Sequence, residues 1–165
     1  MCFSLVHLLL LTSLTGAVTV YQPNETYAVH HIDKEIVDTS RTYMDQPYRI
    51  MTTTFYPIDI ASHCIPYDQP YMSALTAKYN AAAYGELIGA PLPSTIFESI
   101  KLQSCNSSSR LAWIEAARRW PLTILSSGAG GTRQFYSALA EELASRGYIV
   151  ITLDNPGQAV RIRTM

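Results

Sequence analysis

A short apolar segment, a glycine-rich loop, a helical pattern and a second apolar segment follow one another near the end of the chain. Residues 122–125 are apolar and stop at the loop 126–131, which reads Ser-Ser-Gly-Ala-Gly-Gly. Residues 148–153 form the second apolar run, which ends at Asp154. A strand, a helix and a strand in this order form a parallel pair through a right-handed crossover. The pattern therefore predicts an α/β fold in which residues 122–125 are a fully buried strand.

The segment between the loop and the second strand has the spacing of an amphipathic helix. Thr132 is the predicted N-cap and Gly147 the predicted C-cap. Phe135, Leu139 and Leu143 recur every fourth residue, so we expect them to face the sheet. Burial of three such side chains stabilises a fold by roughly 5–8 kcal/mol.

Weaker patterns precede this unit. Residues 27–32 and 48–56 are rich in β-branched and aromatic residues, which predicts two strands. Three segments have helical spacing, and the first two start at a serine that could cap them: residues 73–84, 94–102 and 108–120.

Size and charge exclude several classes of protein. A chain of 165 residues with 48% apolar and 15% charged residues suits one folded domain with one core. The net charge of −1 provides no positive field that would attract nucleic acid or anionic lipid. We therefore expect neither kind of partner.

The first residues have the features of a secretory signal peptide. Residues 5–11 form an apolar run that is too short to span a bilayer, and small residues up to Ala17 suit cleavage. We predict a signal peptide over residues 1–17, a domain over residues 18–165 and secretion of the mature protein. The alternatives are that the apolar run is a buried core segment or that the start of the chain is mispredicted.

Cysteines and glycosylation motifs agree with an extracellular location. Removal of the signal peptide would leave Cys64 and Cys105, an even pair that predicts a disulfide in an oxidising compartment. Asn24 and Asn106 each begin an Asn-x-Ser/Thr motif and are predicted glycosylation sites. Two buried free thiols are the alternative to the disulfide.

The glycine-rich loop is the candidate functional site. Loops at the carboxyl ends of parallel strands hold the chemistry of many α/β proteins, and glycines let backbone N–H groups point at a ligand. The spacing of Gly128, Gly130 and Gly131 does not match the Gly-x-Gly-x-x-Gly pattern of a dinucleotide site. From the residues alone, an oxyanion-binding loop, a phosphate-binding loop and a tight turn remain open.

The chain resembles the platelet-activating-factor acetylhydrolase family of α/β-hydrolases in several motifs. The motifs in the last strand–helix–strand unit are Ser-Ser-Gly-Ala-Gly at 126–130, Tyr-Ser-Ala-Leu-Ala at 136–140 and Leu-Ala-Ser-Arg-Gly-Tyr-Ile-Val-Ile-Thr-Leu-Asp at 143–154. Upstream, residues 49–57 resemble an early strand of the family that ends in Tyr-Pro. Residues 71–77 and the pair Cys64/Cys105 resemble the secreted fungal branch.

The resemblance implies a function and a role for the loop. Members of this family remove the sn-2 acetyl group from 1-alkyl-2-acetylglycerophosphocholine with a serine, a histidine and an acid, and without metal or cofactor. Ala129 matches the position whose backbone N–H binds the oxyanion, and Gly128 and Gly130 shape the loop around it. The implied partner is a phospholipid or a short-chain ester.

The chain departs from the family where the catalytic triad should lie. It contains no Gly-x-Ser-x-Gly motif, and no histidine follows His63. We therefore expect the N-terminal part of an α/β-hydrolase sheet, truncated before the nucleophile turn and inactive by itself. Residues 148–153 would then form an unpaired edge strand. The alternatives are a secreted non-enzymatic binding or structural module, and an incomplete gene model.

Other polar residues offer no replacement site. His30 and His31 are adjacent, so they would point to opposite faces of a strand and could not chelate a metal together. His63 and Cys64 lack the spacing of a metal site. Asp154 precedes the place of the missing nucleophile, which favours a turn-capping role over a catalytic one.

Overall fold

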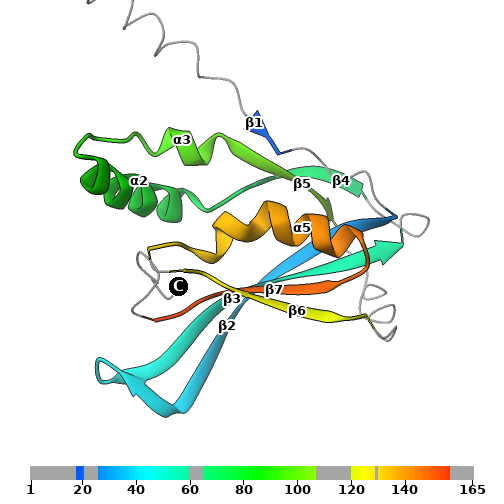
Figure 1. The fold of residues 1–165 in the computed structure, drawn as a ribbon, viewed down its shortest axis with the longest axis horizontal. Coiled ribbons are helices and arrows are strands. Elements are labelled where there is room, and N and C mark those ends of the chain that lie inside the picture. Colours follow the sequence, from blue (N-terminus) through cyan, green and yellow to red (C-terminus); the bar gives the residue numbers. More distant parts are fainter. Residues whose placement is uncertain (1–17, 21–25, 60–64, 107–119, 129, 157–165) are drawn as a thin grey trace, which may run out of the picture.

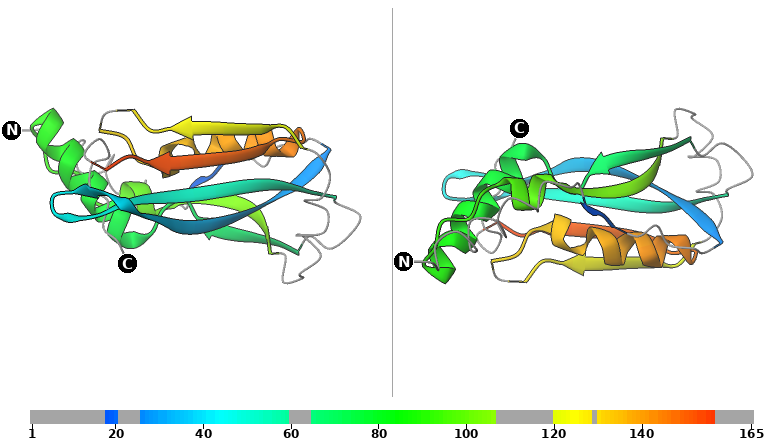
Figure 2. Two further views of the ribbon diagram at one scale, coloured as in Figure 1. Left: turned by 90° about the horizontal axis from the view of Figure 1, so that it is seen from below. Right: turned by 90° about the horizontal axis from the view of Figure 1, so that it is seen from above.

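The structure is a computed structural model that describes residues 18–20, 26–59, 65–106, 120–128 and 130–156. Its described strands form two sheets (Figure 1). The larger sheet has the order β2-β3-β7-β6, with β2 Tyr27–Tyr43, β3 Gln46–Asp59, β7 Ile149–Asp154 and β6 Leu122–Ser126. The smaller sheet has the order β1-β5-β4, with β1 Val18–Thr19, β5 Ile100–Asn106 and β4 Ile65–Pro70. It lies beside β2, on the side away from β6 (Figure 2).

The predicted strand–helix–strand unit is confirmed. β6 and β7 are parallel neighbours, with Leu122 opposite Ile149 and Ser126 opposite Leu153. The connection between them contains the 3₁₀ turn η2, Arg133–Tyr136, and the helix α5, Ser137–Ser145. Helix α5 packs across β2, β3 and β7 (Figure 1). The glycine-rich loop therefore leaves the carboxyl end of β6, as expected.

The predictions that β6 is fully buried and that β7 is an unpaired edge strand are both wrong. β7 is not an edge, because it pairs with β6 on one side and antiparallel with β3 on the other. Among the described strands, β6 lies at one end of the larger sheet, and Leu122 and Ile124 are each 58% exposed. Alternate residues of a strand point to opposite faces. Leu125 therefore packs against the core below α5, while Leu122 and Ile124 lie on the other, open face.

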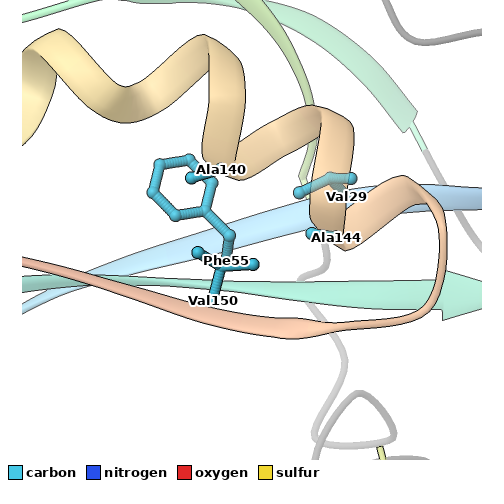
Figure 3. Packing of buried hydrophobic residues seen from close by; sticks show 5 residues of the cluster. All are labelled: Val29, Phe55, Ala140, Ala144 and Val150. Atoms are coloured by element: carbon cyan, nitrogen blue, oxygen red, sulfur yellow. The ribbon is translucent and has the colours of Figure 1, made fainter. Parts of the chain in front are cut away.

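The core beneath α5 uses smaller side chains than the sequence suggests. Ala140 and Ala144 of α5 are fully buried against Val29, Phe55 and Val150 (Figure 3). The prediction that Leu139 faces the sheet is wrong, because its side chain is 49% exposed, while Leu143 packs partly buried at the margin of the core.

The start of helix α5 explains why Ala140 and Ala144, and not Leu139, face the sheet. Thr132 makes no side-chain capping bond, and residues 133–136 form a 3₁₀ turn before the α-helix begins at Ser137. Because a 3₁₀ turn has three residues rather than 3.6, it changes which residues face the sheet. The predicted end is close to the observed one: Gly147 follows the helix with a φ of 93°, and its N–H donates to the Ala144 carbonyl.

The β2–β3 hairpin is longer than the two predicted strands. It extends to a turn at Met44 and Asp45, both with positive φ, and its far end reaches beyond the rest of the sheet (Figure 1). Residues 33–43 are polar because most of their side chains are exposed, so the apolar pattern of a half-buried strand is missing. Asp38 stabilises this end locally, since it accepts hydrogen bonds from Ser40 and Arg41.

Two helices accompany the smaller sheet, α2 (Ala74–Ile88) and α3 (Thr95–Glu98). Ser73 caps α2 as predicted, because its hydroxyl accepts the Thr76 N–H at 3.2 Å. The helix expected over residues 94–102 is limited to the four residues of α3, and residues 100–102 belong to β5. The helix expected over residues 108–120 falls almost entirely outside the described residues.

Candidate functional site

The glycine-rich loop lies where β6 and β7 end together. The Ser127 N–H donates to the Leu153 carbonyl at 3.2 Å, which ties the first part of the loop to β7. The Gly131 N–H donates to the Gly128 carbonyl at 3.0 Å and closes a turn. Gly130 has a φ of 78°, a backbone conformation that residues other than glycine rarely adopt. These two bonds hold the described part of the loop at the sheet edge.

Two further segments contact the loop. Asn155, directly after β7, donates its side-chain N–H to the Ser126 hydroxyl at 2.8 Å. The Tyr84 hydroxyl of α2 donates to the Gly130 carbonyl at 3.3 Å. The described loop residues Ser126, Ser127 and Gly130 are therefore held from β7, from Asn155 and from α2.

The structure tests only some of the predicted site residues. Gly128 and Gly130 lie in the loop at the sheet edge. Ala129, the predicted oxyanion donor, falls outside the described residues, so its role stays a prediction. Cys105 is buried on β5 and Asn106 ends this strand. Cys64, the predicted disulfide partner of Cys105, and Asn24, the other predicted glycosylation site, lie outside the described residues. The disulfide and the glycosylation therefore remain predictions.

A buried ion pair joins the start of η2 to the end of β7. Asp154 accepts the backbone N–H of Arg133 at 2.5 Å and its guanidinium at 2.7 Å. Both side chains are nearly buried, with 9% of Arg133 and 5% of Asp154 exposed. Asp154 therefore anchors the segment that follows the glycine-rich loop, a role that was not predicted beside the turn-capping one.

The ion pair continues into a polar chain across β3 to β2. The Arg133 Nε–H donates to the Thr53 hydroxyl at 3.0 Å, and that hydroxyl donates to Asp33 at 2.5 Å. The Arg133 guanidinium also lies 3.7 Å from the Asp33 carboxylate. This chain of polar side chains was not predicted from the sequence. The available signal was that Arg133 follows the β6 loop while Asp154 ends the adjacent parallel strand, which places both at one sheet edge.

A second buried polar group lies between β2, β5 and α5. The Ser104 hydroxyl of β5 donates to the Glu141 carboxylate at 3.0 Å and lies 3.1 Å from Nδ1 of His31. In a catalytic triad the imidazole lies between the serine and the acid, whereas here the serine lies between the other two. Ser104 and Glu141 are also 98–99% buried, with exposed fractions of 2% and 1%. This arrangement joins β2, β5 and α5 and is structural.

The two histidines do not form a metal site. The His30 ring lies 2.8 Å from the Cys105 carbonyl, while the neighbouring His31 ring contacts Ser104. Across the residues for which the structure gives positions, no three histidine, cysteine or acidic side chains gather as a metal site would require.

Glu141 makes folding stability depend on pH. Burial raises the pKa of its carboxyl from the ordinary 4.5 to about 7, and the hydrogen bond from Ser104 only partly opposes this. The folded state therefore binds the proton more tightly than the unfolded state, and stability falls as the pH rises from about 4.5 through about 7. A shift of this size corresponds to about 3 kcal/mol.

We expect Glu141→Gln to remove this loss while keeping an acceptor for Ser104. The free energy of unfolding, measured by urea denaturation between pH 4.5 and 8, should differ little between variant and wild type at the acid end. At pH 8 the variant should be the more stable protein. Burial lowers the pKa of His31, which acts in the opposite direction, but His31 is present in both proteins. If the unfolding free energies of wild type and variant changed with pH in parallel, Glu141 would not be the group responsible.

No helix in the part of the chain that the structure describes is long and apolar enough to cross a membrane. The chain is similar to an Arthroderma benhamiae protein named "Probable 1-alkyl-2-acetylglycerophosphocholine esterase", with 26% identity over 151 residues. These cover 88% of this chain and 39% of the relative. The chain thus spans about two fifths of the length of that curated relative.

A solved structure has the same fold. The ferulic acid esterase from Streptomyces cinnamoneus matches with a TM-score of 0.62 and 22% identity, over 87% of this chain and 38% of the esterase. The match agrees with the predicted α/β fold, in which helix α5 and the parallel pair β6–β7 form one crossover unit. Residues 55–161 match the family described as platelet-activating factor acetylhydrolase, isoform II, which is more than half of the chain. The chain therefore belongs to the platelet-activating factor acetylhydrolase isoform II family.

Proposed function

We propose that this chain forms the oxyanion-binding side of a secreted serine esterase. The proposed reaction is removal of the sn-2 acetyl group from 1-alkyl-2-acetylglycerophosphocholine, the activity named for the Arthroderma relative. In this reaction a serine attacks the ester carbonyl and the oxygen becomes an anion. The backbone N–H of Ala129 is the proposed donor to that anion.

The position of the loop carries the proposal. The loop starts at the carboxyl end of β6, is tied to Leu153 of β7 and is held by Tyr84 and Asn155. Donors that are fixed before the reaction stabilise a developing charge best, because they need no reorganisation during the reaction. The described loop residues on either side of Ala129 are held in this way, and this supports the proposal.

The chain by itself is expected to lack turnover. Its sequence has no Gly-x-Ser-x-Gly motif and no histidine after His63. Since the members of a triad act as a unit, an oxyanion donor without them retains only a small residue of the catalysis. Secretion, the Cys64–Cys105 disulfide and glycosylation at Asn24 and Asn106 are part of the proposal and rest on the sequence alone.

A loop transplant tests the proposed function. Residues 126–132 of this chain would replace the corresponding loop of the Arthroderma esterase, and hydrolysis of 1-alkyl-2-acetylglycerophosphocholine would be measured. We expect the transplant to keep most of the esterase activity, while this chain alone shows none. Loss of activity in a transplant that folds normally would favour a non-enzymatic role for the loop. Turnover by the chain alone would contradict the expectation that it is inactive without a triad.

A further inference from the structure

The Ser104 hydroxyl lies between an acid and an imidazole, and it has a single hydrogen to share between them. Its oxygen lies 3.0 Å from Oε1 of Glu141 and 3.1 Å from Nδ1 of His31. A hydroxyl donates one hydrogen bond and accepts others. Both contacts are therefore hydrogen bonds only if Ser104 donates to one neighbour and accepts from the other.

Two proton arrangements meet this condition. In the first, Glu141 is ionised and accepts from Ser104, so Ser104 accepts from His31 and the proton of the neutral imidazole is on Nδ1. In the second, Glu141 is protonated on Oε1 and donates to Ser104, which then donates to Nδ1. The imidazole proton is on Nε2 in this second arrangement, because Nδ1 acts as an acceptor.

The position of the Glu141 side chain favours Oε1 as the place for its proton. Glu141 is 1% exposed, and among the described residues its Oε1 contacts Ser104 while its Oε2 has no hydrogen-bond partner. A proton on Oε2 would be a buried donor without an acceptor, which is unfavourable. The second tautomer of His31 carries no such penalty at Nε2, since this ring is only partly buried and lines a cavity of about 470 Å³.

Burial brings both arrangements into the neutral pH range. It raises the pKa of the Glu141 carboxyl to about 7, so the ionised and the protonated acid are both populated near neutral pH. Burial also lowers the pKa of His31 below the ordinary 6.5, so the imidazole is neutral where Glu141 titrates.

The other ionisable groups on the elements around α5 do not compete for this proton. The charge of Asp33 raises the pKa of His31 and that of His30 lowers it, but burial is the larger cause. Burial also raises the pKa of Tyr71, so its phenol is neutral. The remaining groups are an ion pair between η2 and β7 and two uncharged residues of β3: Arg133 with Asp154, and Thr53 and Phe55.

We propose that Glu141, Ser104 and His31 form a proton switch, in which protonation of Glu141 reverses both hydrogen bonds of Ser104 and moves the imidazole proton of His31 from Nδ1 to Nε2. The group gains one proton in total, because Glu141 gains one while His31 loses one at Nδ1 and gains one at Nε2 by exchange with water. His31 and Thr132 line the same cavity. The pH therefore sets whether Nε2 of a residue in the cavity wall accepts or donates. The switch does not depend on the proposed esterase activity.

Nitrogen-15 NMR of the histidine rings in the full chain tests the proposal. Protonated and unprotonated ring nitrogens differ widely in chemical shift, so the spectrum identifies the tautomer of His31. The carboxyl carbon of Glu141, followed by carbon-13 NMR, gives the midpoint of its titration. One pH unit below this midpoint we expect about a tenfold excess of the Nε2–H tautomer, and one unit above it about a tenfold excess of the Nδ1–H tautomer.

His30 is the internal reference in the same spectra. Its Nδ1 lies 2.8 Å from the Cys105 carbonyl, which only accepts, so this nitrogen should keep its proton at every pH. A single His31 tautomer on both sides of the Glu141 midpoint would overturn the proposal. A Glu141 carboxyl that does not titrate between about pH 5 and 9 would overturn it as well.

Three variants separate the hydrogen-bond relay from a simple effect of charge. Glu141→Gln does not titrate, so the tautomer of His31 should be constant over this pH range. Glu142→Gln is the matched control and should keep the wild-type change, because Glu142 is the exposed neighbour that pairs with Arg146. In Ser104→Ala, the tautomer should no longer follow the titration of Glu141. A folded Ser104→Ala protein with the full tautomer change would contradict the relay. If this variant does not fold, the comparison of Glu141→Gln with Glu142→Gln decides.

Discussion

Replacing Asp154 with alanine is expected to lower the free energy of unfolding by about 3–5 kcal/mol. The carboxylate is 5% exposed and bonds both the backbone N–H and the guanidinium of Arg133. Its removal leaves a charge in a site that is 9% exposed. Asp33, at 3.7 Å, compensates only partly, so the lower part of this range is the expected result.

Urea denaturation of matched variants measures this effect. Glu142→Ala is the control, because Glu142 pairs with Arg146 one turn along α5 and both side chains are 40–54% exposed. Pairs of this kind contribute only about 0.3–0.5 kcal/mol. Asp154→Asn should fall between the two, since the amide oxygen can still accept the Arg133 N–H. An Asp154→Ala variant no less stable than Glu142→Ala would contradict the anchoring role.

The local order of elements was predictable because it depends on short-range patterns. The apolar runs around residues 122–125 and 148–153, with a glycine-rich loop and a helix between them, are sufficient to predict the parallel pair β6–β7. The place of the loop follows from the same reasoning. Gly147 marks the helix end because it needs a positive φ that other residues avoid.

Burial was harder to predict because it depends on neighbours that are distant in sequence. An apolar run does not reveal whether a strand is central or outer, so the roles of β6 and β7 were interchanged. Likewise, the sequence does not show the 3₁₀ turn that rotates α5 and places Ala140 and Ala144 against the sheet. Polar residues that pair across the fold, such as Arg133 with Asp154, look like ordinary surface residues in a sequence.

The polar hairpin shows a third limit. Most of residues 33–43 pair with β3, with an irregularity between Asp38 and Thr42, although their side chains are mostly exposed. Since the apolar alternation used to recognise strands reflects burial on one face, a strand exposed on both faces lacks it. Such a strand is recognised only when its partner is known.

The largest kinetic effect is expected at the backbone of Ala129. Within the transplanted loop, Ala129→Pro removes the N–H that is proposed to bind the oxyanion. Loss of one such donor lowers kcat by about a hundred- to a thousandfold. Ala129→Gly keeps the N–H and should change kcat little. The KM should change less than kcat in both variants, because the donor acts mainly in the transition state.

The kcat of these two variants on 1-alkyl-2-acetylglycerophosphocholine tests the central claim most directly. Thermal unfolding of both proteins would confirm that they are equally folded at the assay temperature. The account predicts that the proline variant loses activity a hundredfold or more while the glycine variant retains it. A folded proline variant with the kcat of the unsubstituted transplant would contradict the oxyanion role of this loop.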